Sequence, residues 1–258
     1  MNPERTPVIV ATGQVTERNE IVTAVELAAR ASEAALNAAS GLRGRIQRVS
    51  LVSIVFSPAS KRPASELVKR LGLAGVACET TSPGGNLPQW LVTRAAAEIA
   101  EGKLDATLIA GAEATRSMRA GDPNAHFMQG RQGLQATDSD GEADVAVGPS
   151  MDGLLTAAEL GIRLYKPTTL YPLFENALAH KLGRTFDEQR ASLGPLMSRF
   201  SEIASNHPFA WFKESLTADE ISQVSDANRL VSEPYTKRRN AFPTSASRLE
   251  KRWWPSRP

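Results

Sequence analysis

Two patterns of apolar and polar positions alternate over the first 112 residues of the chain. Short continuous apolar runs, closed by glycine or proline, predict strands that are buried on both faces. Between them lie alanine- and leucine-rich stretches, most of which end at a glycine, and these predict helices. The predicted strands are residues 8–11, 49–56, 76–80 and 104–110, and the predicted helices are residues 20–39, 64–71 and 89–101.

This order of elements predicts the fold class. Strands that alternate with helices along a chain form a parallel, twisted sheet with helices packed on its faces. We therefore expect an α/β core with a mainly parallel sheet and helices on both faces. The pattern leaves the order of the strands open.

The pattern of apolar and polar residues changes after residue 112. Residues 113–153 are polar and rich in glycine and aspartate, which is typical of a long loop. Helical patterns return at residues 170–182, at residues 185–203 with Thr185 as the N-cap, and at residues 216–221. We divide the chain into an α/β core of residues 6–112, a loop and helical insertion of residues 113–242, and a tail of residues 243–258 that we expect to be disordered.

Composition excludes several classes of function. The 30 basic and 28 acidic side chains give a net charge of +2, and nucleic-acid binding needs a concentrated basic face. No apolar run approaches the ~20 residues of a membrane span, and the polar start has no apolar signal segment. We therefore expect a cytoplasmic protein that binds no nucleic acid and has no membrane span.

Cysteine and histidine are too few to form a metal site. The one cysteine, Cys78, lies in a predicted strand, where a buried structural role is favoured over that of a displaced nucleophile. The three histidines are far apart and match no metal-ligand spacing. The acidic run at residues 138–144 lacks the spacing of a calcium loop, so we interpret it as a solvated loop. We expect no bound metal.

Four stretches, taken together, resemble the thiolase superfamily. They follow one another with fitting order and spacing between about residues 6 and 242. The stretches are residues 7–14, residues 80–92 (Thr-Thr-Ser-Pro-Gly-Gly-Asn-Leu-Pro-Gln-Trp-Leu-Val), residues 108–114, and residues 171–178 (Tyr-Pro-Leu-Phe-Glu-Asn-Ala-Leu) followed by Pro234-Tyr235-Thr236-Lys237. Within the superfamily the chain is most similar to thiolase-like acetyl-CoA acetyltransferases related to the sterol-carrier-protein-type thiolases.

The resemblance implies both a fold and an activity. The family fold has two similar α/β halves, and a helical loop domain is inserted in the first half. This chain resembles the first half with its loop domain. Family members transfer or cleave acyl groups on coenzyme A, so acyl-CoA is expected here as a substrate, with no further cofactor. The resemblance also implies a homodimer paired through the nucleophile-side strands, or a sterol-carrier-type partner.

The chain departs from the family pattern at the nucleophile. Ser82 occupies the position of the family cysteine, at the start of the helix after the third predicted strand. A serine hydroxyl is a poor nucleophile unless a base takes its proton, and Pro83 removes a backbone donor from the turn. After Phe242 the sequence resembles nothing in the family, and a second half with its acid and base residues does not follow. We expect a truncated chain that is inactive alone, because acid–base groups contribute ~10²–10⁴ in rate.

Five other residues are candidate substrate-binding residues. Gly84, Gly85 and Asn86 can present backbone N–H groups to an acyl or phosphate group, or form a strand-to-helix turn capped by Asn86. Glu113 lies just beyond a strand end, where open α/β sheets bind ligands, or it ties down a loop. His126 either reaches the mouth of the site or is a solvated loop histidine.

Three hypotheses for the function stay open at this point. The first is a thiolase-like acyl-CoA acyltransferase that is impaired in this form. The second is a non-catalytic module that binds acyl-CoA or another subunit. The third is a truncated fragment without function.

Overall fold

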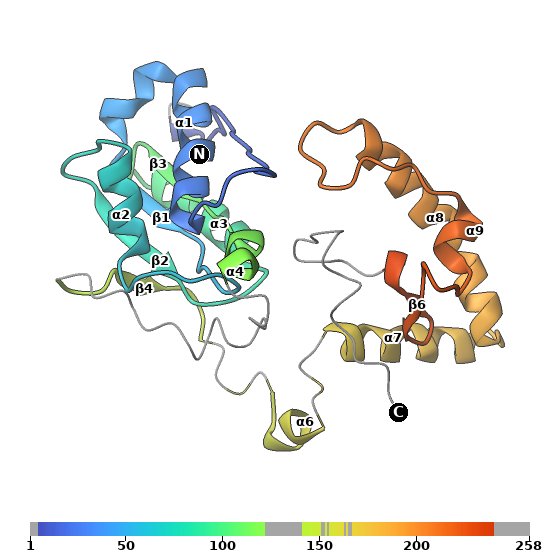
Figure 1. The fold of residues 1–258 in the computed structure, drawn as a ribbon. Helices are drawn as coiled ribbons and strands as arrows, with labels where there is room; N and C mark the ends of the chain where they lie inside the picture. Colours follow the sequence, from blue (N-terminus) through green and yellow to red (C-terminus); the bar gives the residue numbers. More distant parts are fainter. Residues whose placement is uncertain are drawn as a thin grey trace. The chain divides into compact units, whose positions relative to one another are not determined.

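A computed structural model describes residues 5–121, 141–150, 153, 155–162, 164 and 167–239 of the chain. These residues form two compact units, one within residues 1–151 and the other within residues 152–250. Each unit is described by itself (Figure 1). The tail predicted at residues 243–258 lies outside the described residues. The domain bounds drawn from the sequence stay predictions.

The first unit contains a four-stranded sheet in the order β3-β1-β2-β4. Its strands are β1 (Arg48–Leu51), β2 (Ala77–Thr81), β3 (Thr107–Ala110) and β4 (Val145–Val147). All three pairings are parallel, so the carboxyl ends of the strands meet at one edge of the sheet. The fold class predicted from the alternating pattern is confirmed.

Helices pack on both faces of this sheet. Successive strand residues point to opposite faces, and in β1 the buried Val49 and Leu51 join α1 (Ala24–Ala38) and α2 (Pro63–Arg70) in one apolar core. Arg48 and Ser50 point to the other face, toward α3 (Leu87–Ala100). Three smaller elements complete the described unit: the 3₁₀ helix η2 (Ser40–Arg45), α4 (Thr115–Gly121) and β4.

The predicted strand at residues 8–11 is wrong. No strand of the described residues pairs with this segment, and Val8, Ile9 and Val10 are 71%, 76% and 60% exposed. Arg5 fixes its start through bonds to the carbonyl oxygens of Ile99 and Leu104. An apolar β-branched run favours a strand, but a strand forms only where a neighbour supplies hydrogen bonds.

Buried charges connect the sheet to α3. The carboxylate of Glu79, which is 6% exposed, binds both terminal nitrogens of Arg94 at 3.0 and 3.1 Å and accepts the Ser50 hydroxyl. Arg94 and Arg48 also bind Glu98, and the two arginines hold the pKa of this carboxyl below its usual value. The network fixes the rotation of α3 about its axis and its position on the sheet, because a bidentate arginine–carboxylate pair has a defined geometry.

The second unit is mainly helical. Its helices are α6 (Ala157–Gly161), α7 (Pro167–Lys181), α8 (Phe186–Asn206) and α9 (Ala218–Ser222), followed by the hairpin of β5 (Leu230–Ser232) and β6 (Tyr235–Thr236) and the 3₁₀ helix η3 (Lys237–Arg239). The predicted N-cap Thr185 is confirmed, and its side chain forms a capping box with Glu188. Gly194 lets α8 approach α9, because a Cβ there would lie 2.4 Å from the Ser222 hydroxyl.

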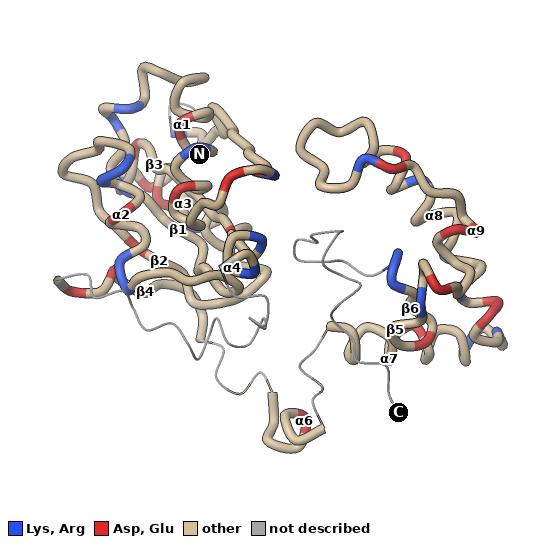
Figure 2. The backbone as a smooth tube through the Cα atoms, viewed as in Figure 1, with Lys and Arg blue, Asp and Glu red and all other residues tan. Residues whose placement is uncertain are grey.

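Two surface properties bear on the expected partners. Among the described helices, none is long and apolar enough to cross a membrane. The backbone trace in Figure 2 shows the positions of Lys and Arg interspersed with those of Asp and Glu along both units. That the chain binds no nucleic acid stays a prediction.

The buried network leads to a stability prediction. Replacing Glu79 with alanine leaves Arg94 without its bidentate partner, and we expect the unfolding free energy of the first unit to fall by about 3 kcal/mol. Urea denaturation followed by circular dichroism measures this loss. As a control, Glu101→Ala breaks an ion pair with Lys103 whose side chains are 55% and 71% exposed, and we expect a much smaller loss because water screens exposed ion pairs. Equal losses in the two variants would contradict a structural role for the Glu79 network.

Candidate functional site

Ser82 lies between the end of β2 and the start of α3. Its backbone N–H donates to the Val147 carbonyl at 2.8 Å, and its hydroxyl donates to the Pro149 carbonyl at 2.7 Å. The hydroxyl proton therefore points at a backbone oxygen and not at a base. The described part of the first unit contains no histidine, so none of its residues supplies an imidazole to activate Ser82.

The turn that follows Ser82 contains Gly84, Gly85 and Asn86. A Cβ on Gly84 would lie 2.3 Å from the Leu87 side chain, so the turn is tight at this glycine. Asn86 takes the N-cap position of α3, as predicted, but its side chain makes no cap hydrogen bond. Binding of an acyl or phosphate group by this turn stays a prediction.

Glu113 follows β3 and binds the loop after β1. Its carboxylate accepts the backbone N–H groups of Val55 at 2.6 Å and Phe56 at 3.0 Å, and also the Ser57 hydroxyl. Ser57 in turn accepts the N–H of Ala114 at 2.9 Å. The carboxylate oxygens are thus used within the protein, in agreement with the loop-tying alternative. Binding of a substrate by Glu113 stays a prediction.

The structure places Ser82 and Glu113 at the same edge of the sheet but not together. They follow β2 and β3, which lie on either side of β1. Two strand spacings separate such positions by roughly 10 Å. The loop after β1 lies between them, with the Ser53 N–H bound to the Thr81 hydroxyl at 3.0 Å. His126 lies outside the described residues.

Asp144 and the turn after β4 were missed by sequence reasoning. The acidic run that contains Asp144 was expected to be a solvated loop, but the Asp144 carboxylate accepts the N–H of Ala64 at 2.6 Å and the hydroxyl of Thr80 at 3.3 Å. The signal that would have found β4 is Val145-Ala146-Val147 followed by Gly148-Pro149, a short apolar run closed by turn residues. Its three residues fall below the length at which a pattern identifies a strand.

Cys78 lies within β2, opposite Val49 of β1. It is half-buried, and burial raises the pKa of its thiol. A raised pKa keeps the thiol protonated at neutral pH, which disfavours a nucleophilic role. Among the described residues, no group of three or more histidine, cysteine, aspartate or glutamate side chains is arranged to hold a metal ion.

Two of the stretches that carry the family resemblance meet in the second unit. Glu175 of α7 accepts the Gln189 amide at 2.8 Å and the Tyr235 hydroxyl at 3.5 Å. Burial raises the pKa of the Tyr235 hydroxyl, and the Glu175 charge raises it further. Residues 171–178 and 234–237 are therefore parts of one polar contact, although they are far apart in the sequence.

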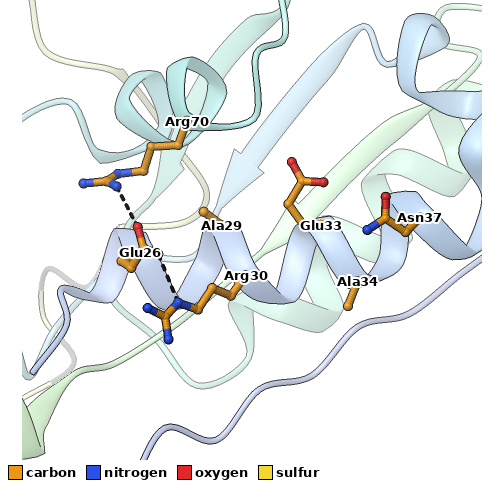
Figure 3. Close-up of a pocket in the computed structure, with 7 residues that line it drawn as sticks. All are labelled: Glu26, Ala29, Arg30, Glu33, Ala34, Asn37 and Arg70. Carbon is orange, nitrogen blue, oxygen red and sulfur yellow. Dashed lines mark hydrogen bonds and ion pairs between the residues drawn. The ribbon is translucent and has the colours of Figure 1, made fainter. Parts of the chain in front are cut away.

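A shallow depression of about 560 Å³ lies over α1 and near α2, and no residue next to Ser82 lines it. Figure 3 shows Glu26 between Arg30 and Arg70, and its carboxylate binds them at 3.0 and 2.6 Å. The charged residues in the depression are paired, Glu26 with Arg30 and Arg70 and Glu33 with Arg43, so it offers no unpaired charge to a ligand. We place the candidate site at Ser82 and not here.

The α/β fold of the chain is similar to that of a solved thiolase-like protein. The chain is similar to the monomeric SCP2-thiolase-like protein type 1 from Mycobacterium smegmatis, with 26% identity and a TM-score of 0.65 over 92% of this chain. The chain is therefore related to the SCP2-thiolase-like proteins, as the resemblance predicted. The match covers 42% of that protein, so this chain spans less than half of its length. No family model and no curated protein matches the sequence.

The position of Glu113 leads to a prediction that separates its two roles. Replacing Glu113 with glutamine puts an amide N–H₂ opposite the N–H and O–H donors of the loop. We expect faster hydrogen exchange at Val55 and Phe56 and a loss of about 1–3 kcal/mol in stability. Exchange followed by mass spectrometry measures the first effect, with Glu101→Gln at an exposed position as the control. Unchanged exchange in Glu113→Gln would contradict the loop-tying role.

Proposed function

We propose that this chain is a thiolase-like protein of acyl-CoA metabolism that binds acyl-CoA but does not itself transfer the acyl group. The support for acyl-CoA as the ligand is the relationship to SCP2-thiolase-like proteins. The observation that carries the non-catalytic part is the bond from the Ser82 hydroxyl to the Pro149 carbonyl. A hydroxyl whose proton is held by a carbonyl oxygen has no base to make it a nucleophile.

The position of Ser82 is nevertheless suited to a thioester. It lies in the turn that leads from β2 into α3, four residues before the N-cap Asn86, and a helix N-terminus favours negative charge on an attacking thiolate or on the oxygen of a tetrahedral intermediate. This field lowers the pKa of a thiol into a useful range. It does not do so for a serine hydroxyl, so the same position binds without reacting.

A monomeric state belongs to the same proposal. The related protein is described as monomeric, and we extend this state to the present chain. A role in lipid metabolism and a cytoplasmic location are proposed on the same relationship.

The proposal predicts the effect of restoring a thiol. In a Cys78→Ala background, Ser82→Cys is expected to become acetylated by acetyl-CoA, because the thiolate attacks the thioester carbonyl and expels coenzyme A as its thiolate, which takes up a proton. Thr93→Cys in the same background places a thiol on the exposed side of α3 and reports untemplated transfer. We expect Ser82→Cys to react at least about tenfold faster, as bound and oriented reactants do. Intact-mass spectrometry follows the adducts.

The unmodified chain and the titration of coenzyme A complete the test. The chain with its native Ser82 should stay unmodified, and calorimetry should detect coenzyme A binding. Acetyl transfer to Ser82 itself, abolished in Ser82→Ala, would show that the chain is catalytic. An absence of heat, together with equal rates for Ser82→Cys and Thr93→Cys, would overturn the binding proposal.

A further inference from the structure

One face of α8 in the second unit is apolar and open. Leu196, Phe200 and Ile203 follow one another at spacings of four and three residues, so they share one face of the helix. Their exposed fractions are 50%, 55% and 53%. We call these three side chains the outer face of α8, because the opposite face packs on α9 at Gly194. Neighbouring apolar side chains left open in this way mark a surface that binds another segment or molecule.

The chain leaves the described part of the second unit from a point beside α8. Arg239, the last described residue, is 6% exposed and donates from Nη2 to the Ser222 hydroxyl at 2.9 Å. Ser222 is the α9 residue that lies against Gly194 of α8. Residues 240–258, which we call the C-terminal segment, therefore start within a few side-chain contacts of this helix.

The C-terminal segment is long enough to reach the outer face. Fourteen residues lead from Arg239 to Trp253, and an extended chain of that length spans up to roughly 45 Å. The 21 residues of α8 extend over about 32 Å, and a helix is about 10 Å across. The segment can therefore pass around α8 and reach any part of its outer face.

The C-terminal segment also has side chains that such a face binds. Trp253 and Trp254 are adjacent, and large aromatic side chains dominate the energy of contacts because each can bury ~150–250 Å². The segment has few other large apolar residues, so it cannot form a core of its own. A segment of this composition binds through a small number of aromatic anchors.

The charges of the C-terminal segment and of the region around α8 and α9 are opposite. Residues 240–258 contain four basic side chains and one acidic side chain, whereas residues 186–222 contain six acidic and three basic side chains. The chain as a whole has a net charge of +2, so the acidic character of residues 186–222 is local. Opposite charges favour the encounter of two surfaces and disfavour wrong partners.

We propose that the C-terminal segment docks on the outer face of α8 through Trp253 and Trp254 and covers this face within the same chain. A flexible tether gives an effective concentration in the millimolar range, so a contact with a dissociation constant of about 1 mM is already half occupied. Release of the segment exposes the outer face to other molecules, and the segment thus controls access to it. This inference rests on the second unit and is independent of the proposed ligand.

The experiment uses bimane, a fluorophore that tryptophan quenches on contact. In the full chain with Cys78→Ala, the label is attached to Arg199→Cys, which lies beside the outer face and has a side chain that is 64% exposed in the native chain. Trp253→Phe/Trp254→Phe removes the quenchers and keeps an aromatic ring at both positions. We expect the label to become about twofold brighter or more, because the docked state is at least half populated. A label at the exposed Lys69 of α2 is the control and should not change.

A second pair of variants tests the face. Leu196→Asn/Ile203→Asn makes two half-exposed positions of the outer face polar, and it should brighten the label at position 199. Leu173→Asn/Leu178→Asn makes the matched change on α7, where the side chains are 52% and 45% exposed, and it should leave the label unchanged. Circular dichroism checks the helix content. If the α8 pair loses helix, Leu196→Ala takes its place, because alanine favours a helix.

Three results would overturn the proposal. Equal brightness before and after the tryptophan replacement would show that the segment does not dock beside position 199. Quenching that the α8 variants do not relieve, or that the α7 pair relieves equally, would show that the outer face is not the binding surface. Quenching that grows with protein concentration would show that a second copy supplies the tryptophans. Quenching that is independent of concentration and relieved by both the tryptophan and the α8 variants supports the proposal.

Discussion

The structure of the first unit depends on the ion pair between Glu79 of β2 and Arg94 of α3. A buried carboxylate is costly unless it is fully bonded, and here two guanidinium N–H groups and the Ser50 hydroxyl satisfy it. Such a pair adds little net stability compared with apolar packing. It does set one rotation of α3, and α3 sets the turn from Ser82 to Asn86. The chemistry available at Ser82 therefore depends on a contact made well inside the unit.

Much of this core could be predicted from the sequence alone. Strands β1, β2 and β3 lie in short, largely β-branched or apolar segments between helices, and the alternation of such segments with helices is typical of parallel sheets. The helices were found because alanine and leucine repeat at helical spacing and because Thr185 supplies a cap. These signals lie within a few residues of one another, so a local pattern contains them completely.

The two errors in the strand predictions arise because pairing depends on segments that are far apart in the sequence. Residues 8–11 have the side chains of a strand but no partner among the described residues, and Val145–Val147 have a partner but almost no pattern. Pairing is a property of two segments, and the register of β4 depends on Asp144 binding α2 from 79 and 80 residues away. The candidate site likewise combines a residue found from a local pattern with a partner that lies far away in the sequence. Ser82 was found from its stretch of sequence, whereas its acceptor Pro149 lies 67 residues further on.

Ser82 and β4 are parts of one arrangement. The turn at Gly148 and Pro149 both ends β4 and takes the proton of the Ser82 hydroxyl, so a change that lifts β4 from β2 also frees this hydroxyl. Because the same residues serve both contacts, the two events are linked, and the linkage is reciprocal. A ligand that competes for the Ser82 hydroxyl weakens the hold on β4. The Ser82 hydroxyl is thus a hydrogen-bond donor that ties the turn after β4 to the end of β2.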